Sequence, residues 1–238
     1  IYGYTMATAS LREAVAGWQR RRHGWEVSPE HVLLSSSVGL MLGLCLQTFT
    51  EPGEGVVAQP PAWSPLLELP ARNDRAVILN PLRRDDAGHH HMDLDALALQ
   101  LDAGEGARML WLCNPHNPTG NAWDRGTLEA IGALCEAHDL LIVSDEIHAD
   151  LMYGGRRHVP IASLSPALSA RTITLSSPAK TFNIPGLSVA YAIVEDDALR
   201  HRLEEAMARL HLGPPNLFGL LATELVYQRG EPWLTALM

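Results

Sequence analysis

Short apolar runs separated by polar turns recur along the chain, and they predict buried β-strands. Each run is three to six residues long and most are apolar at successive positions, which is typical of strands covered on both faces. The predicted strands span residues 31–34, 56–58, 76–79, 109–113, 140–143, 172–175 and 189–194.

Apolar residues at near-helical spacing lie between these runs and predict helices, as Leu128, Ile131 and Leu134 do in one segment. Ser10 followed by Glu13 is a capping-box pattern that predicts the start of the first helix. The predicted helices span residues 10–22, 40–49, 94–101, 127–138, 198–210 and 217–228, with Gly24 ending the first and Asp93 and the pair Asp196-Asp197 among the caps. Strands that alternate with helices predict an α/β fold with a parallel sheet.

Polar clusters follow three of the predicted strands, at residues 114–120, 144–150 and 176–183. In an open parallel sheet, ligands bind beyond the carboxyl ends of the strands. We therefore expect the three clusters to converge on one crevice. The last cluster contains Lys180, whose amine can form a Schiff base with a carbonyl. Taken alone, Lys180 also fits a solvated surface lysine.

The motifs in these clusters read Asn-Pro-His-Asn-Pro-Thr-Gly, Ser-Asp-Glu-Ile-His and Ser-Pro-Ala-Lys-Thr-Phe-Asn. Together they resemble the fold-type I pyridoxal-phosphate enzymes, most closely the cysteine-S-conjugate β-lyases of the MalY/PatB type, with class I/II aminotransferases as near relatives. The resemblance runs from about Gly3 to the last residue. It implies a three-layer αβα sandwich with a mostly parallel seven-stranded sheet, in which the strand at 189–194 is antiparallel.

The resemblance also implies pyridoxal 5′-phosphate as the cofactor and assigns catalytic roles. Lys180 would bond to the cofactor and later remove the substrate Cα proton, while Asp145 would pair with the pyridine nitrogen. Asn117 would donate to the ring O3′, and His148 occupies the place of a second O3′ partner. The alternatives are a strand-end turn residue for Asp145 and a satisfied loop histidine for His148.

Further residues are candidates for holding the phosphate and the ring. Ser37 and the Val38 amide begin a predicted helix, where exposed N–H groups and the helix dipole favour an anion. The resemblance adds Ser177 to the phosphate ligands, places Trp63 as a stacking aromatic, and implies a homodimer in which Tyr4 reaches the neighbouring subunit's phosphate. The alternatives are an ordinary helix cap at Ser37, a core tryptophan and a loop tyrosine. The helix start lacks the glycine fingerprint of a nicotinamide site.

Composition narrows the function classes. Acidic residues outnumber basic ones by 27 to 18, which argues against nucleic-acid and membrane partners. The resemblance implies a small amino-acid substrate. The three cysteines have no paired spacing, and we see no signal peptide or spanning segment, so we expect a cytoplasmic protein. The histidines at 89–91 are adjacent, have no ligand cluster at suitable spacing, and predict a polar loop rather than a metal site.

One departure from the aminotransferase pattern points to the reaction. Many aminotransferases place a phosphate-binding arginine a few residues past the lysine, but residues 184–189 contain no cation. Lyases of the MalY/PatB type also lack it, so we expect β-elimination: an S-substituted L-cysteine such as L-cystathionine would give pyruvate, ammonia and a thiol. An aminotransferase, and a regulatory protein that retains the fold, are the alternatives.

The resemblance also suggests how much of a family member is present. The sequence runs from Ile1 to Met238, and family members extend further at both ends. We expect residues 1–238 to be the pyridoxal-phosphate-binding large domain, without the N-terminal segment and the C-terminal small domain of the family.

Overall fold

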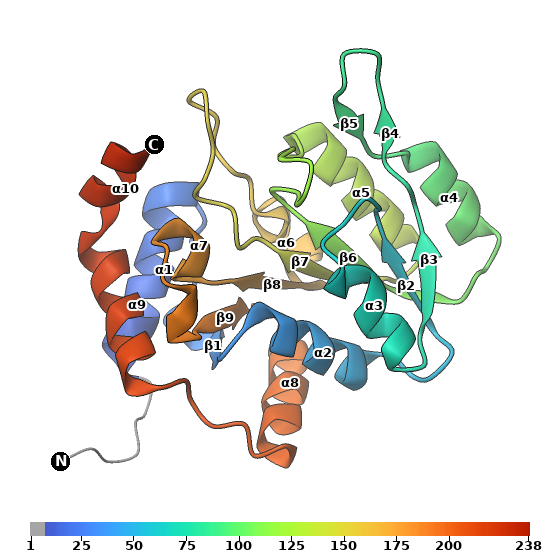
Figure 1. Cartoon of the computed structure of the whole chain (residues 1–238). Coiled ribbons are helices and arrows are strands. Elements are labelled where there is room, and N and C mark those ends of the chain that lie inside the picture. Colours follow the sequence, from blue (N-terminus) through green and yellow to red (C-terminus); the bar gives the residue numbers. More distant parts are fainter. Residues whose placement is uncertain (1–7) are drawn as a thin grey trace.

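A seven-stranded sheet forms the centre of the computed structural model, which describes residues 8–238 (Figure 1). The strand order is β1-β9-β8-β7-β6-β2-β3. Only β9 runs antiparallel to its neighbours; the other pairs are parallel, which confirms the predicted sheet. The strands are β1 Val32–Ser35, β2 Gly55–Ala58, β3 Ala76–Leu79, β6 Ala107–Cys113, β7 Leu141–Asp145, β8 Thr172–Ser176 and β9 Ala190–Ile193.

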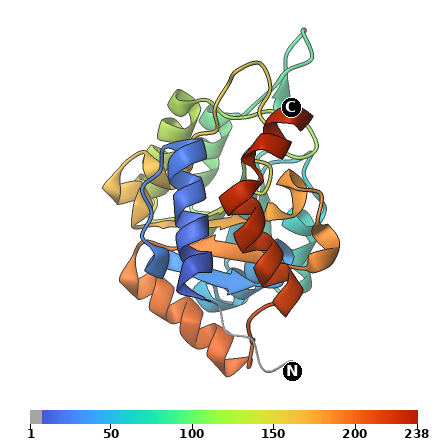
Figure 2. The ribbon, with the colours of Figure 1, turned by 90° about the vertical axis from the view of Figure 1, so that its left-hand side faces the viewer.

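Helices cover both faces of the sheet, because alternate strand residues point into different apolar clusters. Trp111 of β6 packs with α2, α3 and α8, whereas its neighbours Leu110 and Leu112 pack with α4 and α5 on the other face. A third cluster joins α1 and α9 to β1 and β9, and Figure 2 shows these two helices side by side. This arrangement confirms the three-layer αβα sandwich.

All six predicted helices form, together with shorter ones that the spacing did not predict. The helices are α1 Ala9–His23, α2 Val38–Phe49, α3 Pro65–Arg72, α4 Leu94–Asp102, α5 Arg125–Ala137, α6 Pro166–Ser169, α7 Pro178–Thr181, α8 Asp197–Arg209, α9 Leu217–Arg229 and α10 Glu231–Leu237, with 3₁₀ turns at Pro29–His31, Ile161–Ser163 and Pro185–Leu187. Within residues 8–238 no helix combines the length and apolarity that crossing a membrane requires.

The helix ends test the predicted caps. The cap predicted at Ser10 is wrong: Thr8 caps α1, its hydroxyl accepting from the Leu11 amide at 3.2 Å, and Ser10 lies inside the helix. Gly24 ends α1 in the left-handed conformation, with φ of 68°, as predicted. Asp93 is confirmed as the cap of α4, and of the pair predicted for α8, Asp196 is the cap and Asp197 is the first residue of the helix.

The segment around the three histidines is a small hairpin rather than the predicted polar loop. β4 Arg83–Arg84 pairs antiparallel with β5 His90–His91. The carboxylate of Asp85 holds the hairpin end, because it accepts from the His89 amide at 2.8 Å and lies 2.9 Å from Nε2 of His91. These contacts account for the histidines by local structure.

Glycine at 219 is required by close packing, which gives a test of the fold. A Cβ there would lie 2.3 Å from Cγ2 of Val189 and 2.6 Å from the Leu187 carbonyl oxygen. Gly219→Ala should therefore lower the free energy of unfolding by about 1–3 kcal/mol, measured by denaturant titration. Gly43→Ala is the matched helix control: nothing lies within 4 Å, so it should be neutral or stabilising. Equal effects at both positions would contradict this packing.

Candidate active site

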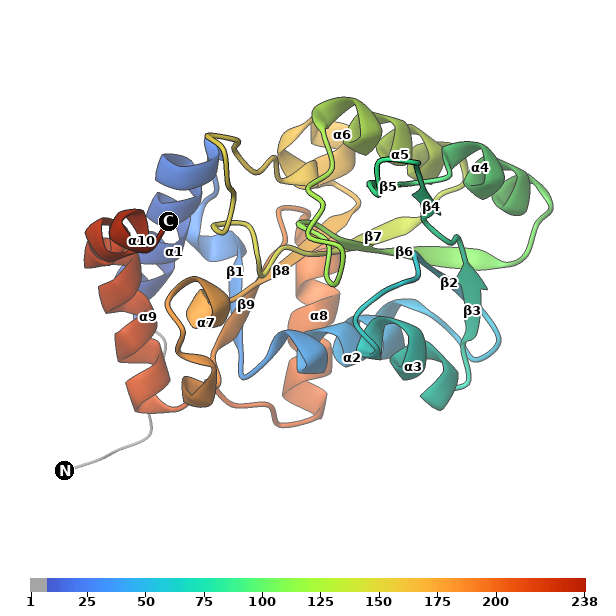
Figure 3. The same cartoon turned by 45° about the horizontal axis from the view of Figure 1, so that its top comes forward.

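The segments that follow β6, β7 and β8 meet at the carboxyl edge of the sheet around a cavity of about 100 Å³. In Figure 3 the segment after β7 runs from the strand end past α7, toward α1 and α6. The structure therefore brings the three polar clusters of the sequence together. The cavity is lined by Val38, Trp63, Cys113, Asn117, Asp145, Ile147, His148 and Lys180.

Asp145 is the acid of this cavity and the last residue of β7. In the register of the sheet it lies opposite Cys113 of β6 and Leu175 of β8, and it is only 4% exposed. Within residues 8–238 its carboxylate has one hydrogen bond, from the Ile147 amide at 3.1 Å. Burial raises the pKa of Asp145 to about 6, although the charge of Lys180 opposes this shift. Such a carboxylate is stabilised by a cationic or protonated ligand placed against it.

Lys180 supplies the only primary amine of a side chain, because the sequence contains no other lysine. It lies on α7, whose first turn is capped by Ser177. Within the described part of the chain the Lys180 amine makes no hydrogen bond or ion pair, and its side chain is exposed toward the cavity that it lines. The amine is therefore free to react with a ligand that enters.

The start of α2 forms the other end of the site. The Ser37 hydroxyl accepts a hydrogen bond from the Leu40 amide at 3.1 Å, and the Ser37 carbonyl accepts one from the Met41 amide. Among the described residues, the amides of Val38 and Gly39 have no acceptor. Free N–H groups at the positive end of a helix favour an anion there.

The Ser177 hydroxyl, a predicted phosphate ligand, already makes two hydrogen bonds within the protein. It donates to the Val189 carbonyl at 2.5 Å and accepts from the Ala179 amide at 3.0 Å. These bonds position α7 against the segment leading into β9. Phosphate binding by Ser177 stays a prediction, and it requires a second acceptor bond or a rotation of the hydroxyl.

Trp63, Asn117 and His148 border the cavity between these ends. The Trp63 amide donates to the Asn117 carbonyl at 3.1 Å, which ties the two loops together. Trp63 is 37% exposed, so it is not a core residue. Burial, and then the charge of Lys180, lower the pKa of His148 below its ordinary value. A neutral imidazole beside the lysine is the result.

Two residues of the lining were absent from the sequence prediction. Cys113 ends β6, accepts from the Asn117 amide at 3.4 Å, and has a pKa raised by burial. Ile147 is the second residue after Asp145. Their places at or just after strand ends were the available signal, but cysteine and isoleucine are also ordinary core residues. The remaining candidate, Tyr4, lies outside the described residues.

A buried polar network lies behind the site and fixes the segment after β7. Asp150 accepts from Thr181 Oγ1 at 2.8 Å and from the Trp18 indole at 3.1 Å, and it lies 3.2 Å from Nε2 of His23. Thr181 is the neighbour of Lys180, so this carboxylate fastens the lysine-bearing helix to α1. The end of β7 and the segment after it thus carry both Asp145 and the group that anchors Lys180.

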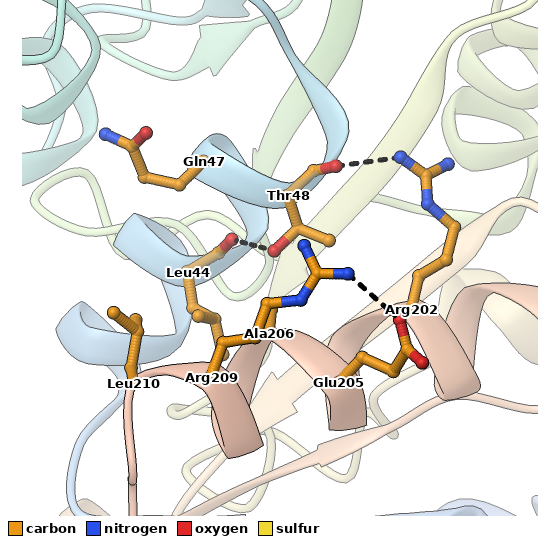
Figure 4. Close-up of a pocket in the computed structure, with 8 residues that line it drawn as sticks. All are labelled: Leu44, Gln47, Thr48, Arg202, Glu205, Ala206, Arg209 and Leu210. Carbon is orange, nitrogen blue, oxygen red and sulfur yellow. Dashed lines mark hydrogen bonds and ion pairs between the residues drawn. The ribbon is translucent and has the colours of Figure 1, made fainter.

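A larger hollow lies elsewhere, between α2 and α8, with a volume of about 360 Å³. Figure 4 shows that its arginines have partners within the lining: Arg202 donates to the Thr48 carbonyl at 2.8 Å, and Arg209 pairs with Glu205 at 3.3 Å. It lacks a convergent acid and amine. The smaller cavity at Lys180 is the better candidate on chemical grounds.

Comparison with known proteins shows the family of this chain. The family model described as aminotransferase class I and II matches residues 1–225. The chain belongs to this family.

Individual relatives are similar over the whole chain. Cystathionine beta-lyase PatB of Bacillus subtilis (strain 168) is 40% identical over 238 residues, covering 100% of this chain and 61% of the relative. Protein MalY of Escherichia coli (strain K12) is 33% identical over 239 residues, covering 100% and 60%. The chain thus spans about three fifths of the length of these relatives.

A solved structure shows the same fold. Cystalysin from Treponema denticola, whose crystal structure contains a pyridoxal 5′-phosphate cofactor, superposes with a TM-score of 0.95 at 28% identity. The match covers 99% of this chain and 59% of cystalysin. The fold predicted from the sequence is confirmed.

The raised pKa of Asp145 makes stability depend on pH. Between about pH 4 and 6 the unfolded chain releases the Asp145 proton while the cofactor-free folded protein retains it, so this group lowers the free energy of unfolding as pH rises. Asp145→Asn should remove the effect, and its stability advantage over the wild type should grow by roughly 2–3 kcal/mol across that window.

Denaturant titrations at a series of pH values measure this difference directly. Asp95→Asn, at an exposed position of α4, is the control for loss of a carboxylate. A stability difference between Asp145→Asn and wild type that stays constant from pH 4 to pH 7 would contradict the burial argument.

Proposed function

We propose that the protein binds pyridoxal 5′-phosphate in the cavity at Lys180 and acts as a carbon–sulfur β-lyase. The observation that carries the proposal is the meeting of three groups in one place: a unique lysine, a buried carboxylate and a helix start with free amides. Each group matches one part of the cofactor, which has an aldehyde, a ring nitrogen and a phosphate.

The residues present fit this cofactor. Asp145 has no cationic hydrogen-bond partner among the described residues, which leaves a place for a protonated ring nitrogen. The amides of Val38 and Gly39 lack acceptors, and they would hold the phosphate with Ser37 and Ser177. When bound, the cofactor supplies an aldehyde that reacts with amines and a ring that accepts electrons from the substrate Cα.

The side chains of this chain then have distinct roles. The Lys180 amine would bond to the aldehyde, and after substrate displaces it would take the proton from Cα. Asp145 would hold a proton at the ring nitrogen, because a carboxylate next to a cation favours both charged forms. Asn117 and the neutral His148 would donate to the ring oxygen, and Trp63 would cover one ring face.

The proposed reaction is elimination rather than amine transfer. An S-substituted L-cysteine such as L-cystathionine and one water would give a thiol, pyruvate and ammonia. Two observations support it: relatives named cystathionine beta-lyase are similar over the whole chain, and residues 184–189 contain no arginine. Amine transfer is the second candidate, favoured by the family model itself.

We further propose that the chain is the cofactor-binding large domain of a cytoplasmic homodimer. The three cysteines are all free and buried, which suits a reducing compartment. Exposed apolar side chains on α9, Phe218, Leu221 and Leu225, offer surface for another subunit or domain to cover. Tyr4 would complete the partner's phosphate site.

An assay separates the two reactions. The protein, loaded with pyridoxal phosphate, should release pyruvate from L-cystathionine without any added keto acid, and Lys180→Arg should lower that rate by at least about 10²-fold. Glutamate formation that depends on 2-oxoglutarate, without pyruvate release, would instead establish an aminotransferase. Cofactor binding with neither reaction would favour the regulatory alternative.

Cofactor attachment can be tested apart from turnover. Borohydride reduction with pyridoxal phosphate should add one pyridoxyl group to the wild type, because Lys180 is the only lysine. Lys180→Arg keeps the positive charge and should acquire none. Peptide mapping by mass spectrometry distinguishes Lys180 from the terminal amine. Label confined to the terminal amine, or equal in both proteins, would refute the assignment.

A further inference from the structure

A third cavity, of about 270 Å³, lies between α1, the loop of residues 149–158 and α10. Its lining is strongly basic, although the chain as a whole has a formal net charge of −9. Four arginines line it, Arg21, Arg22, Arg156 and Arg157, against a single carboxylate, Glu231. Four positive charges this close together repel one another, so they are stabilised by neighbouring carboxylates or by an anionic ligand.

Neighbouring protein groups bind two of these arginines, Arg21 and Arg22. Arg21 donates to the Tyr227 carbonyl at 2.6 Å and lies 3.9 Å from Glu231. Arg22 lies 3.5 Å from Glu231 and 3.8 Å from the buried Asp150. These two carboxylates therefore balance about half of the positive charge of the four arginines.

The other two arginines are unbalanced. Among the described residues, the guanidinium groups of Arg156 and Arg157 have no hydrogen-bond or ion-pair partner. The backbone brings them to the cavity through Gly154 and Gly155, both with positive φ, 67° and 71°. This turn directs the chain back toward His158, which is buried and pairs with Glu146 at 2.6 Å. Arg156 and Arg157 are themselves exposed, so their guanidinium groups are open to a ligand, while His158 anchors the chain directly after them.

We propose that this cavity binds a small dianionic oxyanion of the phosphate class, either inorganic phosphate or a phosphate monoester. Two uncompensated guanidinium charges match the two charges of such a ligand, and the planar guanidinium fork matches its oxygens. The site is distinct from the cofactor cavity, because its lining shares no residue with the set around Lys180. The inference does not depend on the proposed function.

Binding at this site acts on the segment that carries the catalytic candidates. Ala149 and Met152 line the basic cavity, while His148 lines the cofactor cavity, so the two sites lie along one loop. Asp150, between them, contacts both Arg22 and Thr181. An anion that orders the arginine pair therefore stabilises the loop from its other end.

The test is a titration of the protein with inorganic phosphate at constant ionic strength, followed by amide NMR. Saturable shifts are expected at Gly154, Gly155 and the arginine amides. Arg156→Gln with Arg157→Gln should weaken binding at least tenfold. Arg72→Gln with Arg125→Gln removes the same charge from exposed ion pairs on α3 and α5, and should leave binding unchanged.

Three results would contradict an anion site at Arg156 and Arg157. The first is a set of shifts confined to Val38 and Gly39, and the second is an equal weakening of binding in both double variants. The third is a set of shifts that never saturate. Glycerol phosphate in place of inorganic phosphate distinguishes the source: tighter binding assigns a phosphate monoester, and weaker binding assigns the free ion.

Discussion

The parallel register of β6, β7 and β8 is the constraint on which the site depends. Cys113, Asp145 and Leu175 are cross-strand partners at the carboxyl ends of these strands. Each strand therefore releases its loop at the same edge of the sheet, and residues separated by dozens of positions face one cavity. A shift of one residue in β7 would turn the Asp145 side chain to the opposite face.

Burial at this edge of the sheet sets the pKa of Asp145. Asp145 sits between covered strands with one backbone hydrogen bond, so its carboxylate is poorly solvated and its pKa rises to about 6. For Asp150, five residues further on, the interaction with His23, and then the hydrogen bonds from Thr181 and Trp18, lower the pKa despite burial. One carboxylate is left for a ligand, and the other fixes the helix that carries Lys180.

Much of this could be predicted from sequence because the strands are continuous apolar runs and the motifs follow them directly. The strand at 109–113 and the cap at Asp196 are local features, and both were confirmed. The bond from Trp18 to Asp150 joins residues 132 positions apart, so no local pattern signals it. α7 is only four residues long and has no apolar period. The Thr8 cap competes with Ser10 in sequence, and only the path of the chain decides between them.

The central claim is that Lys180 and Asp145 hold the two ends of one cofactor ring. A crystal structure of the protein grown with pyridoxal phosphate tests it most directly. The account predicts continuous density from the Lys180 Nζ to the cofactor, the ring nitrogen within hydrogen-bond distance of Asp145, and the phosphate at the Val38 and Gly39 amides. A cofactor bound in another cavity, or one in this cavity with its ring nitrogen turned away from Asp145, would contradict it.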